Sequence, residues 1–423
     1  MSLTDFDIND KVDFSTSMIS QTGWKYIRVK DVITKIGSGV TPKGGSEVYI
    51  KKGIPFLRSQ NVYNDGLRIS DVSYIDEETN RKMQNSQLRP FDILINITGA
   101  SIGRTCIVPQ TLKKGNINQH IIFLRIKKRK VDFLSYYFKS PYIKDYIMMI
   151  QAGSSKEALN MGQLLNTPIF LPGPSEQTQI ANYLDRKTSA IDKKIALLKK
   201  KINTYKELRK SLINETVCRG LNKNVKLVDS GIEWIGKIPE HWTIERIKGH
   251  FEIGRGRVIG QMELIENGQY PVFSSQTEND GCLGYINTYD FNSTLITWTT
   301  DGVNAGTVFK RSGKFNCTNI CGTLKPIHKN VDIDFMTLAI QESTKHNKRI
   351  DTNGAKIMNN EMKVIQIVFP PKQEQEKIAL YLDEKTSKID QIISNITAQI
   401  DGLKELRKTL INDVVTGKVK VTS

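Results

Sequence analysis

Polar and basic side chains gather in a few short stretches of this chain, and their chemistry is the most informative feature of the sequence. These stretches include Arg58-Ser59-Gln60-Asn61, Asn116-Ile117-Asn118-Gln119-His120 and Ser274-Ser275-Gln276. Amide and guanidinium groups form hydrogen bonds with the edges of nucleic-acid bases, whereas cations contact phosphates. For any single residue, the alternative is a structural one, because Asn and Gln also cap turns in loops.

The charge of the chain points in the same direction. Lys and Arg number 61 against 44 Asp and Glu, which gives a net charge of +17. Such an excess is typical of nucleic-acid-binding proteins, although acidic proteins and anionic membranes also attract basic chains. The excess is spread over both halves of the sequence, which favours the nucleic-acid interpretation.

Patterns for catalysis are incomplete. Gly37-Ser38-Gly39 and Gly254-Arg255-Gly256 lack the third glycine of a dinucleotide site, and the segment from Gly231 to Lys237 is followed by Ile238 where a phosphate-binding loop needs Ser or Thr. Cys317 and Cys321 form one isolated pair, so they are expected in a strand core rather than on a metal. We predict no catalytic residue, metal site or cofactor in this chain.

A long segment occurs twice, and it must position whatever does the chemistry. At an offset of 198, residues of 176–214 recur in 374–412. The identical pairs include Glu176/Glu374, Gln177/Gln375, Ile180/Ile378, Ala181/Ala379, Leu184/Leu382, Asp192/Asp390 and the block Lys206-Glu207-Leu208-Arg209-Lys210, which recurs as Lys404-Glu405-Leu406-Arg407-Lys408. The chain therefore consists of two similar halves.

Both copies are predicted to be long helices. Apolar residues recur by steps of three and four, which is the pattern of a coiled-coil seam. The predicted seam consists of Leu184, Ile191, Ile195, Leu198, Ile202, Tyr205, Leu208 and Leu212, and of Leu382, Ile389, Ile393, Ile396, Ile400, Leu403, Leu406 and Leu410. Each helix of about 40 residues would be roughly 60 Å long. Because both copies belong to one chain, we expect an intramolecular antiparallel pair rather than a dimer.

The segments before the two helices correspond more loosely. Trp24 and Trp242 open similar runs of alternating apolar and polar residues, and a short apolar strand precedes each helix, at Pro168 to Leu171 and at Ile365 to Phe369. We predict an α+β chain with a pseudo-two-fold internal repeat, in which two α/β domains are separated by two long helices. The predicted boundaries are 1–174 and 241–371 for the domains, 175–221 and 372–423 for the helices, and 222–240 for a linker.

The composition suggests a compartment. Five cysteines without a regular spacing favour a reducing environment. The polar start, Met1 to Asp10, does not resemble a signal peptide, and no apolar run approaches the roughly 20 residues of a membrane span. We expect a cytoplasmic protein.

The repeated helices carry a resemblance to a known family. With their Glu-Gln-x-x-Ile-Ala start, their Asp-x-Lys-Thr-Ser-x-Ile-Asp run and their Leu-Arg-Lys block, they resemble those of the DNA-specificity subunits of type I restriction-modification systems. The stretch from Asp229 through Trp234-Ile235-Gly236 to Pro239-Glu240-His241-Trp242 is similar to the opening of the second recognition domain in that family. The resemblance covers nearly the whole chain.

The resemblance implies a function and a set of partners. Each variable domain would be a target-recognition domain that reads one half of a bipartite, asymmetric double-stranded DNA site, and the helix pair would set the spacing between the halves. Two modification subunits would supply S-adenosylmethionine and adenine methylation, and two restriction subunits would supply a motor and nuclease with ATP and Mg²⁺.

Within the recognition domains, we predict DNA contacts by residue type and loop position. The candidates in the first domain are Lys43, Arg58, Ser59, Gln60, Asn61, Thr98, Ser101, Arg104, Asn118, Gln119, Ser154 and Lys156. Those in the second are Arg255, Arg257, Ser274, Gln276, Thr300, Asn304, Lys314, Asn319 and Lys356.

Two other functions are compatible with parts of the sequence. A self-sufficient nuclease or methyltransferase of unfamiliar motif would show turnover on DNA with magnesium and S-adenosylmethionine. A coiled-coil scaffold for proteins would not bind DNA at modest salt. The duplication and the basic charge favour the sequence-reading function over both.

Overall fold

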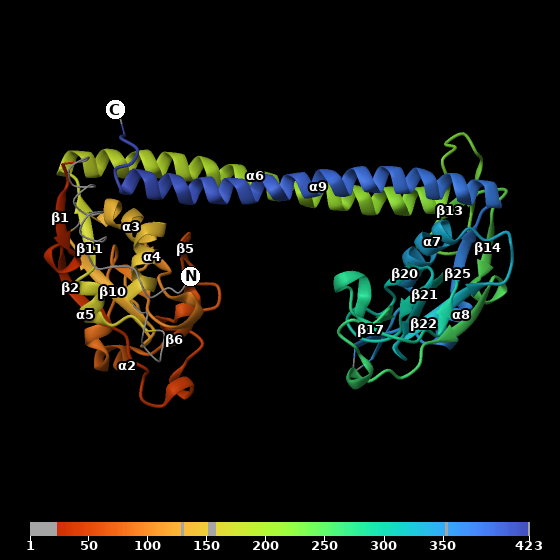
Figure 1. The fold of residues 1–423 in the computed structure, drawn as a ribbon, viewed down its shortest axis with the longest axis horizontal. Helices are drawn as coiled ribbons and strands as arrows, with labels where there is room; N and C mark the ends of the chain where they lie inside the picture. Colours follow the sequence, from red (N-terminus) through yellow and green to blue (C-terminus); the bar gives the residue numbers. More distant parts are fainter. Residues whose placement is uncertain (1–22, 128–130, 151–157, 352–353, 422–423) are drawn as a thin grey trace. The chain divides into compact units, whose positions relative to one another are not determined.

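The computed structural model describes residues 23–127, 131–150, 158–351 and 354–421. The chain forms two compact units: unit 1 comprises residues 1–198 and 398–423, and unit 2 comprises residues 199–397. Each unit contains one α/β head, which we name head 1 (residues 23–171) and head 2 (residues 227–369). Each also contains a stretch of both long helices, α6 (Pro174–Arg219) and α9 (Lys372–Val415) (Figure 1).

Head 1 is built from short strands in several small sheets. A four-stranded antiparallel sheet has the order β2-β10-β7-β8, a three-stranded sheet has the order β6-β3-β9, and β1 pairs with β11 and β4 with β5. The strands are β1 (Lys25–Arg28), β2 (Ile33–Ser38), β3 (Ile54–Leu57), β4 (Val62–Tyr63), β5 (Gly66–Leu67), β6 (Ser73–Ile75), β7 (Ile93–Asn96), β8 (Thr105–Ile107), β9 (Asn116–Ile117), β10 (Ile121–Ile126) and β11 (Pro168–Leu171). Their helices are α2 (Glu77–Lys82), α3 (Val131–Lys139), α4 (Pro141–Ile150) and α5 (Met161–Leu165).

Head 2 repeats this plan. Its four-stranded sheets have the orders β15-β22-β19-β20 and β17-β16-β21-β18, and β14 pairs with β25. The strands are β12 (Leu227–Asp229), β13 (Lys237–Pro239), β14 (Thr243–Arg246), β15 (Phe251–Arg255), β16 (Tyr270–Phe273), β17 (Cys282–Ile286), β18 (Phe291–Asn292), β19 (Leu295–Thr299), β20 (Val308–Arg311), β21 (Lys314–Cys317), β22 (Cys321–Pro326), β23 (Arg349–Asp351), β24 (Gly354–Lys356) and β25 (Gln366–Phe369). Its helices are α7 (Ile333–His346) and α8 (Asn359–Val364).

The two heads share hydrogen bonds as well as strand order. In head 1, β3 pairs in parallel with β9, as β16 pairs with β21 in head 2. The turn after β7 is closed by a bond from the Gly103 N–H to the Asn96 carbonyl (3.0 Å), and the turn after β19 by one from the Gly306 N–H to the Thr299 carbonyl (2.8 Å). The heads are therefore two versions of one backbone frame.

Buried aliphatic side chains join the long helices to each head. In unit 1, Leu184 of α6 and Val414 of α9 share a core with Phe133 of α3. In unit 2, Val217 of α6 and Leu382 of α9 lie in the core of head 2. Since the beginning of each helix meets the end of the other, α6 and α9 pack in antiparallel directions within each unit. Figure 1 shows α3 between the strands of head 1 and these helices.

The repeated Glu-Gln pair at the helix starts has a structural role in both units. The indole N–H of Trp24 donates to Oε1 of Glu176 (3.1 Å), and that of Trp242 donates to Oε2 of Glu374 (3.0 Å). The amide of Gln177 donates to the Pro172 carbonyl (2.7 Å), and Gln375 makes the equivalent bond to the carbonyl of Pro370 (2.8 Å). These contacts fix each helix start beside the tryptophan that precedes β1 in head 1 or β14 in head 2.

The predicted seam is wrong at two positions. Leu208 and Leu406 are more than half exposed. Their neighbours pair with the other helix instead: Arg209 Nε lies 3.0 Å from Asp390, and Arg407 Nε lies 3.2 Å from Asp192. The two ion pairs correspond at the offset of 198, so the repeat extends to the contacts between helices. Partly exposed ion pairs stabilise the fold by at most about 1 kcal/mol each. Their main effect is therefore to specify the register and the direction of the two helices.

The fold class predicted from the sequence, two α/β domains with long helices in an internal repeat, is confirmed by this architecture. The domain boundaries given above stay a prediction. Among the described helices, none is both long and apolar enough to cross a lipid bilayer.

Head 1 has one further polar attachment to α6. The hydroxyl of Tyr136 on α3 donates to Oδ1 of Asp185 (2.6 Å) and lies 3.2 Å from Oγ1 of Thr188. Burial raises the pKa of the Tyr136 phenol, so it stays a donor throughout the physiological range. This bond ties α3 to the helix pair.

We expect Tyr136→Phe to lower the free energy of unfolding of unit 1 by about 1 to 3 kcal/mol, because Asp185 loses its phenolic donor. Chemical denaturation of the full chain measures this loss. The control is Tyr26→Phe, which removes a hydroxyl from a side chain that is 48% exposed and should change little. Equal stability of both variants would contradict the assigned role.

Candidate nucleic-acid interface

In head 1, three separate loops meet beside the ends of the strands. The hydroxyl of Thr41, after β2, donates to Oε1 of Gln119, between β9 and β10 (2.6 Å). Oγ1 of Thr98, after β7, lies 2.8 Å from Nδ1 of His120. Two of the predicted contact residues, Thr98 and Gln119, therefore belong to one polar cluster, although 21 positions separate them in sequence.

The loop that follows β3 is the fourth to contribute to this cluster. Nδ2 of Asn96 donates to the carbonyl of Ser59 (2.8 Å), which places the segment after β3 beside the end of β7. Arg58 is half-buried, and its Nε has no hydrogen-bond partner among the described residues. A desolvated and unpaired N–H is costly to maintain, and because this atom is shielded from solvent, Arg58 can offer it to an external acceptor only when its side chain turns outward.

Two glycines allow the loops to approach each other. A Cβ on Gly39 would lie 2.1 Å from the carbonyl oxygen of Asn118, and a Cβ on Gly256 would lie 2.2 Å from that of Cys317. The N–H of Gly39 donates to the carbonyl of Ile121, the first residue of β10 (3.1 Å), and the N–H of Gly256 donates to the carbonyl of Cys321, the first residue of β22 (3.0 Å). The incomplete Gly-x-Gly pieces of the sequence thus have a packing function.

Head 2 brings the equivalent loops together with different side chains. The hydroxyl of Thr300 donates to the Ile320 carbonyl (3.0 Å), and Nδ2 of Asn304 donates to the Ser275 carbonyl (3.2 Å). Nε of Arg255 donates to the carbonyl of Asn319. Lys356 adjoins the cluster through a backbone bridge to Asp301.

Several predicted contact residues have their polar groups bonded inside the protein. Asn61 is buried, and its side chain accepts from the Arg58 N–H (2.9 Å) and donates to the Arg68 carbonyl (2.9 Å). Buried Asn118 accepts from the His120 N–H (3.2 Å). These two residues shape the loops, and a direct DNA contact by either stays a prediction.

In head 2 the same holds for two candidates. Ser274 is buried and accepts from the Thr318 hydroxyl (3.2 Å). Arg257 binds Glu263 (2.9 Å) and Asp290 (3.1 Å), and the hydrogen bond to Glu263 raises the pKa of its guanidinium. Two carboxylates neutralise this arginine, so its attraction for phosphate is weak in this conformation.

The remaining candidates fall into four groups. Lys43 and Gln60 are exposed in the loops after β2 and β3. Ser101 and Gln276 donate to the carbonyls of Thr98 (3.3 Å) and Cys282, respectively. Lys314 begins β21, at the strand end opposite the cluster, with its Nζ 4.6 Å from the ring centre of Tyr289. Ser154 and Lys156 lie outside the described residues.

The sequence-based list missed several residues of the cluster in head 1. Thr41 and His120 contact predicted residues directly. Arg68 and Tyr63 lie beside Arg104, with the guanidinium carbons of Arg68 and Arg104 at 3.8 and 5.0 Å from the Tyr63 ring centre. His120 ends a polar stretch that the sequence made visible, whereas no local pattern marks Arg68.

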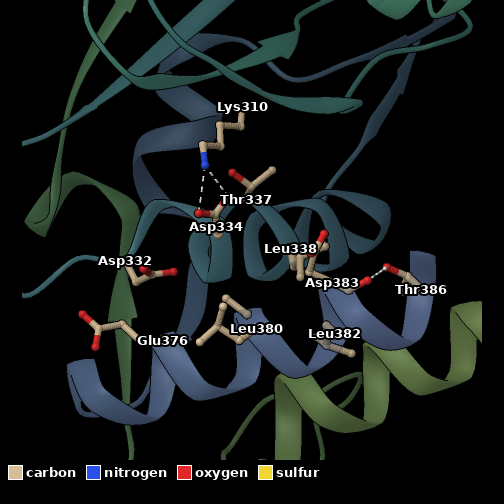
Figure 2. A pocket seen from close by; sticks show the side chains of 11 residues that line it. Lys310, Asp332, Asp334, Thr337, Leu338, Glu376, Leu380, Leu382, Asp383 and Thr386 are labelled. Carbon is tan, nitrogen blue, oxygen red and sulfur yellow. Dashed lines mark hydrogen bonds and ion pairs between the residues drawn. The ribbon is translucent and has the colours of Figure 1, made fainter. Parts of the chain in front are cut away.

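Unit 2 also contains a groove between α7 and the first part of α9. Its volume is about 640 Å³. At its rim, Nζ of Lys310 binds both carboxylate oxygens of Asp334 (2.6 and 2.8 Å), and Leu380 is 73% exposed (Figure 2). The carboxylates that line it are Asp332, Asp334, Glu376 and Asp383. Their charge repels phosphate, so the groove is unsuited to DNA.

Unit 1 shows what can fill such a groove. Asp185 and Thr188, which bind Tyr136, correspond to Asp383 and Thr386 at the offset of 198. On α7, Leu338 is among the residues that line the groove. A leucine cannot bond to Asp383 as the phenol of Tyr136 bonds to Asp185.

The cysteines lie in the cores. Cys317 and Cys321 belong to an apolar cluster of head 2, and within the described part of the chain no three potential metal-binding side chains of His, Cys, Asp or Glu lie together. Burial raises the pKa of Cys106 to about 12, of Cys218 to about 11 and of Cys321 to about 11. Their thiolate forms are therefore scarce near neutral pH.

Three comparisons with known proteins bear on this site. A family model described as "Type I restriction modification DNA specificity domain" matches residues 21–206 and 239–401. S.MpnORF615P of Mycoplasma pneumoniae, described as a candidate type I specificity subunit, is 33% identical over 224 residues, which are 52% of this chain and 88% of that protein. The type I restriction enzyme MpnII specificity subunit of the same organism is 38% identical over 165 residues, 38% of this chain but only 48% of that protein.

Solved structures support the fold. A chain from a study of complex assembly and conformational transition of the type I restriction-modification system aligns with a TM-score of 0.72 at 14% identity, covering 94% of this chain and 98% of that one. The HsdS subunit from Thermoanaerobacter tengcongensis aligns with a TM-score of 0.54 at 15% identity, covering 94% and 97%.

The fold and the paired loop clusters define a protein with two copies of one reading module. With the family model matching most of its length, the chain belongs to the type I restriction-modification DNA specificity family. The family predicted from the repeated helices is thereby confirmed, and so is the function of a DNA-specificity subunit. Nothing in the comparisons favours a scaffold or a self-sufficient enzyme.

Replacing Gly256 with Ala should lower the free energy of unfolding by about 1 to 3 kcal/mol, because the new methyl group overlaps the Cys317 carbonyl. DNA binding by head 2 should weaken with it. Denaturation and binding titrations measure both effects. Gly249→Ala is the matched control, since a Cβ there meets no atom within 4 Å; similar losses in both variants would refute the packing argument.

The buried thiols should resist a disulfide reagent. At pH 8, Cys106, Cys218 and Cys321 in the native chain should react at least about 100-fold more slowly than in urea, because their pKa values are raised and the reagent cannot reach them. A Ser189→Cys variant, exposed on α6, supplies the fast control. Rapid labelling of the native wild-type thiols at these positions would contradict the burial.

Proposed function

We propose that this chain is a noncatalytic subunit that reads a bipartite, asymmetric DNA sequence, with one half-site for each head. The observation that carries the proposal is the repeated loop cluster: the same backbone turns occur in both heads, but at equivalent positions they present Thr98, Gln119 and Arg58 in one and Asp301, Asn319 and Ser274 in the other. A shared frame with different side chains suits two unlike half-sites.

Charge supports DNA as the ligand of these clusters. The chain carries a net charge of +17, and neither Arg58 nor Arg104 forms an ion pair with a carboxylate of the described residues. Contacts of such cations with phosphates release counterions, so affinity should fall steeply with salt. Amides and hydroxyls of the same loops are suited to base edges.

The long helices are proposed to set the spacer between the half-sites. Both α6 and α9 contribute buried residues to the core of each unit and contain no interruption. At about 1.5 Å per residue, a heptad adds about 10 Å of helix, which is about three base pairs of duplex. Because seven residues make almost two whole turns, a heptad changes length with little rotation.

Partners would perform the chemistry. We propose two modification subunits with S-adenosylmethionine for adenine methylation and two restriction subunits with ATP and Mg²⁺, in the cytoplasm. A similar solved chain comes from work on assembly of the type I system, and a similar protein is the specificity subunit of a type I restriction enzyme. The acidic, partly apolar groove of unit 2 is a surface suited to a basic segment of a protein partner.

Inserting one heptad into both helices, after Leu198 and after Thr397, should lengthen the selected spacer by about three base pairs while both half-sites stay the same. Selection from randomised duplexes by the full chain with its modification subunits measures the spacer. The matched control inserts seven residues after Asn224, in the exposed segment that follows α6, and should not alter it. An unchanged spacer in the helix variant would refute the spacing role, and selection of no two-part site by the wild type would refute the proposed function.

A further inference from the structure

We propose that Arg68 and Arg104, both stacked on Tyr63, are the guanine-reading pair of head 1. The inference rests on the proposed function and names the residues and the bases that give head 1 its specificity. Arg104 was a candidate on sequence grounds, whereas Arg68 and Tyr63 emerge only from the structure.

The aromatic ring orders the two guanidinium groups. Their central carbons lie 3.8 Å (Arg68) and 5.0 Å (Arg104) from the ring centre of Tyr63. A guanidinium that stacks through its face keeps its N–H donors at the edge, free for hydrogen bonds in its own plane. The stack thus restricts the rotamers of two long side chains without consuming their donors.

Hydrogen bonds of two asparagines hold the hairpin β4–β5, which carries Tyr63 and leads to Arg68. Nδ2 of Asn61 donates to the Arg68 carbonyl (2.9 Å), and the Arg68 N–H donates to the Asn61 carbonyl (2.9 Å). Oδ1 of Asn64 accepts from the N–H of Thr105, the residue after Arg104 (2.9 Å). Two asparagines therefore fix the hairpin next to the turn of Arg104, and the buried amide of Asn61 acts by positioning Arg68.

The positive charge of the pair is available. Arg104 has no carboxylate partner in the described part of the chain, and Arg68 has one, Asp65, at 3.5 Å with both side chains more than half exposed. An exposed pair three residues apart is weak and is readily exchanged for another acceptor. Both guanidinium groups can therefore turn to a ligand without breaking a buried interaction.

Head 2 contains a similar stack that is used differently. Arg311 lies 3.7 Å from the ring centre of Phe273 and 4.3 Å from that of Phe309, but it is only 3% exposed and binds Asp280 (2.6 Å). It holds the turn of Asn279 and Asp280, both at positive φ. The strands β16 and β17 are joined by this turn, with no counterpart of the hairpin β4–β5. Accessible stacked arginines thus distinguish head 1 from head 2 among the described residues.

The chemistry of an arginine fork selects guanine. In the major groove, guanine presents O6 and N7, two acceptors at the spacing of two guanidinium N–H donors, whereas adenine presents one acceptor and one donor. Phosphate also accepts a fork, but a phosphate contact would weaken binding to all sequences alike. The inference therefore predicts guanine at up to two positions of one half-site.

The test compares substitutions that keep charge. The full chain with its modification subunits selects from randomised duplexes as wild type, Arg68→Lys, Arg104→Lys, Tyr63→Phe and Tyr63→Leu. Each lysine variant should lose about 10-fold or more of the guanine preference at one position of half-site 1, with half-site 2 and the salt dependence unchanged. Tyr63→Phe should retain the preference because the ring remains, and Tyr63→Leu should reduce it at the positions read by both arginines.

Controls distinguish a loss of guanine reading from a loss of folding and from a loss of phosphate contacts. Arg81→Lys, at an exposed position on α2, should leave the selected sequence unchanged, and thermal unfolding verifies that each variant folds. Uniform weakening over all sequences would assign the arginines to phosphates and overturn the inference, as would an unaltered guanine preference. In both cases a wild type that still selects a two-part site leaves the proposed function intact; a wild type that selects none overturns both.

Discussion

The burial of aliphatic side chains from both long helices in the core of each head is the constraint on which the rest depends. Leu184 and Val414 in unit 1, and Val217 and Leu382 in unit 2, are almost fully buried. A long helix with one apolar stripe is unstable in water unless that stripe is covered. Here each helix is covered by the other helix and by a head, so the head and the helix pair of each unit form one cooperative core.

Around that core, the duplication supplies matching polar attachments. The tryptophan that precedes β1 or β14 binds the first-turn glutamate of the long helix that follows its head, and the arginine of each Leu-Arg-Lys block meets an aspartate of the other helix. Their individual energies are small, but they depend on geometry and therefore specify one register. Attachments differ where the heads diverge, as Tyr136 on α3 bonds to α6 whereas Leu338 on α7 lines an open groove.

Some side chains of the reading loops shape the loops themselves, whereas others can contact DNA. Gly39 and Gly256 permit the close approach of loops. The polar groups of Asn61 and Ser274 are hydrogen-bonded within the turns. Arg58 and Arg104 form no ion pair with a carboxylate of the described residues. A loop that reads bases needs both classes, since an arginine discriminates only when its backbone is held in place.

The sequence by itself determined the internal repeat, the two long helices, the two α/β heads and the family, because these depend on residue spacing within a segment and on a pattern that occurs twice. It also identified the polar loops of Thr98 and Gln119 as candidates for DNA contact, whereas only the structure showed that these loops meet. Only the tertiary structure decided which cations are available: Arg257 is neutralised by Asp290, Arg311 is buried against Phe273, and Arg68 stacks on Tyr63 beside Arg104. The physical reason is that the availability of a charged or polar group depends on partners that are close in space, and most of these partners are distant in the chain.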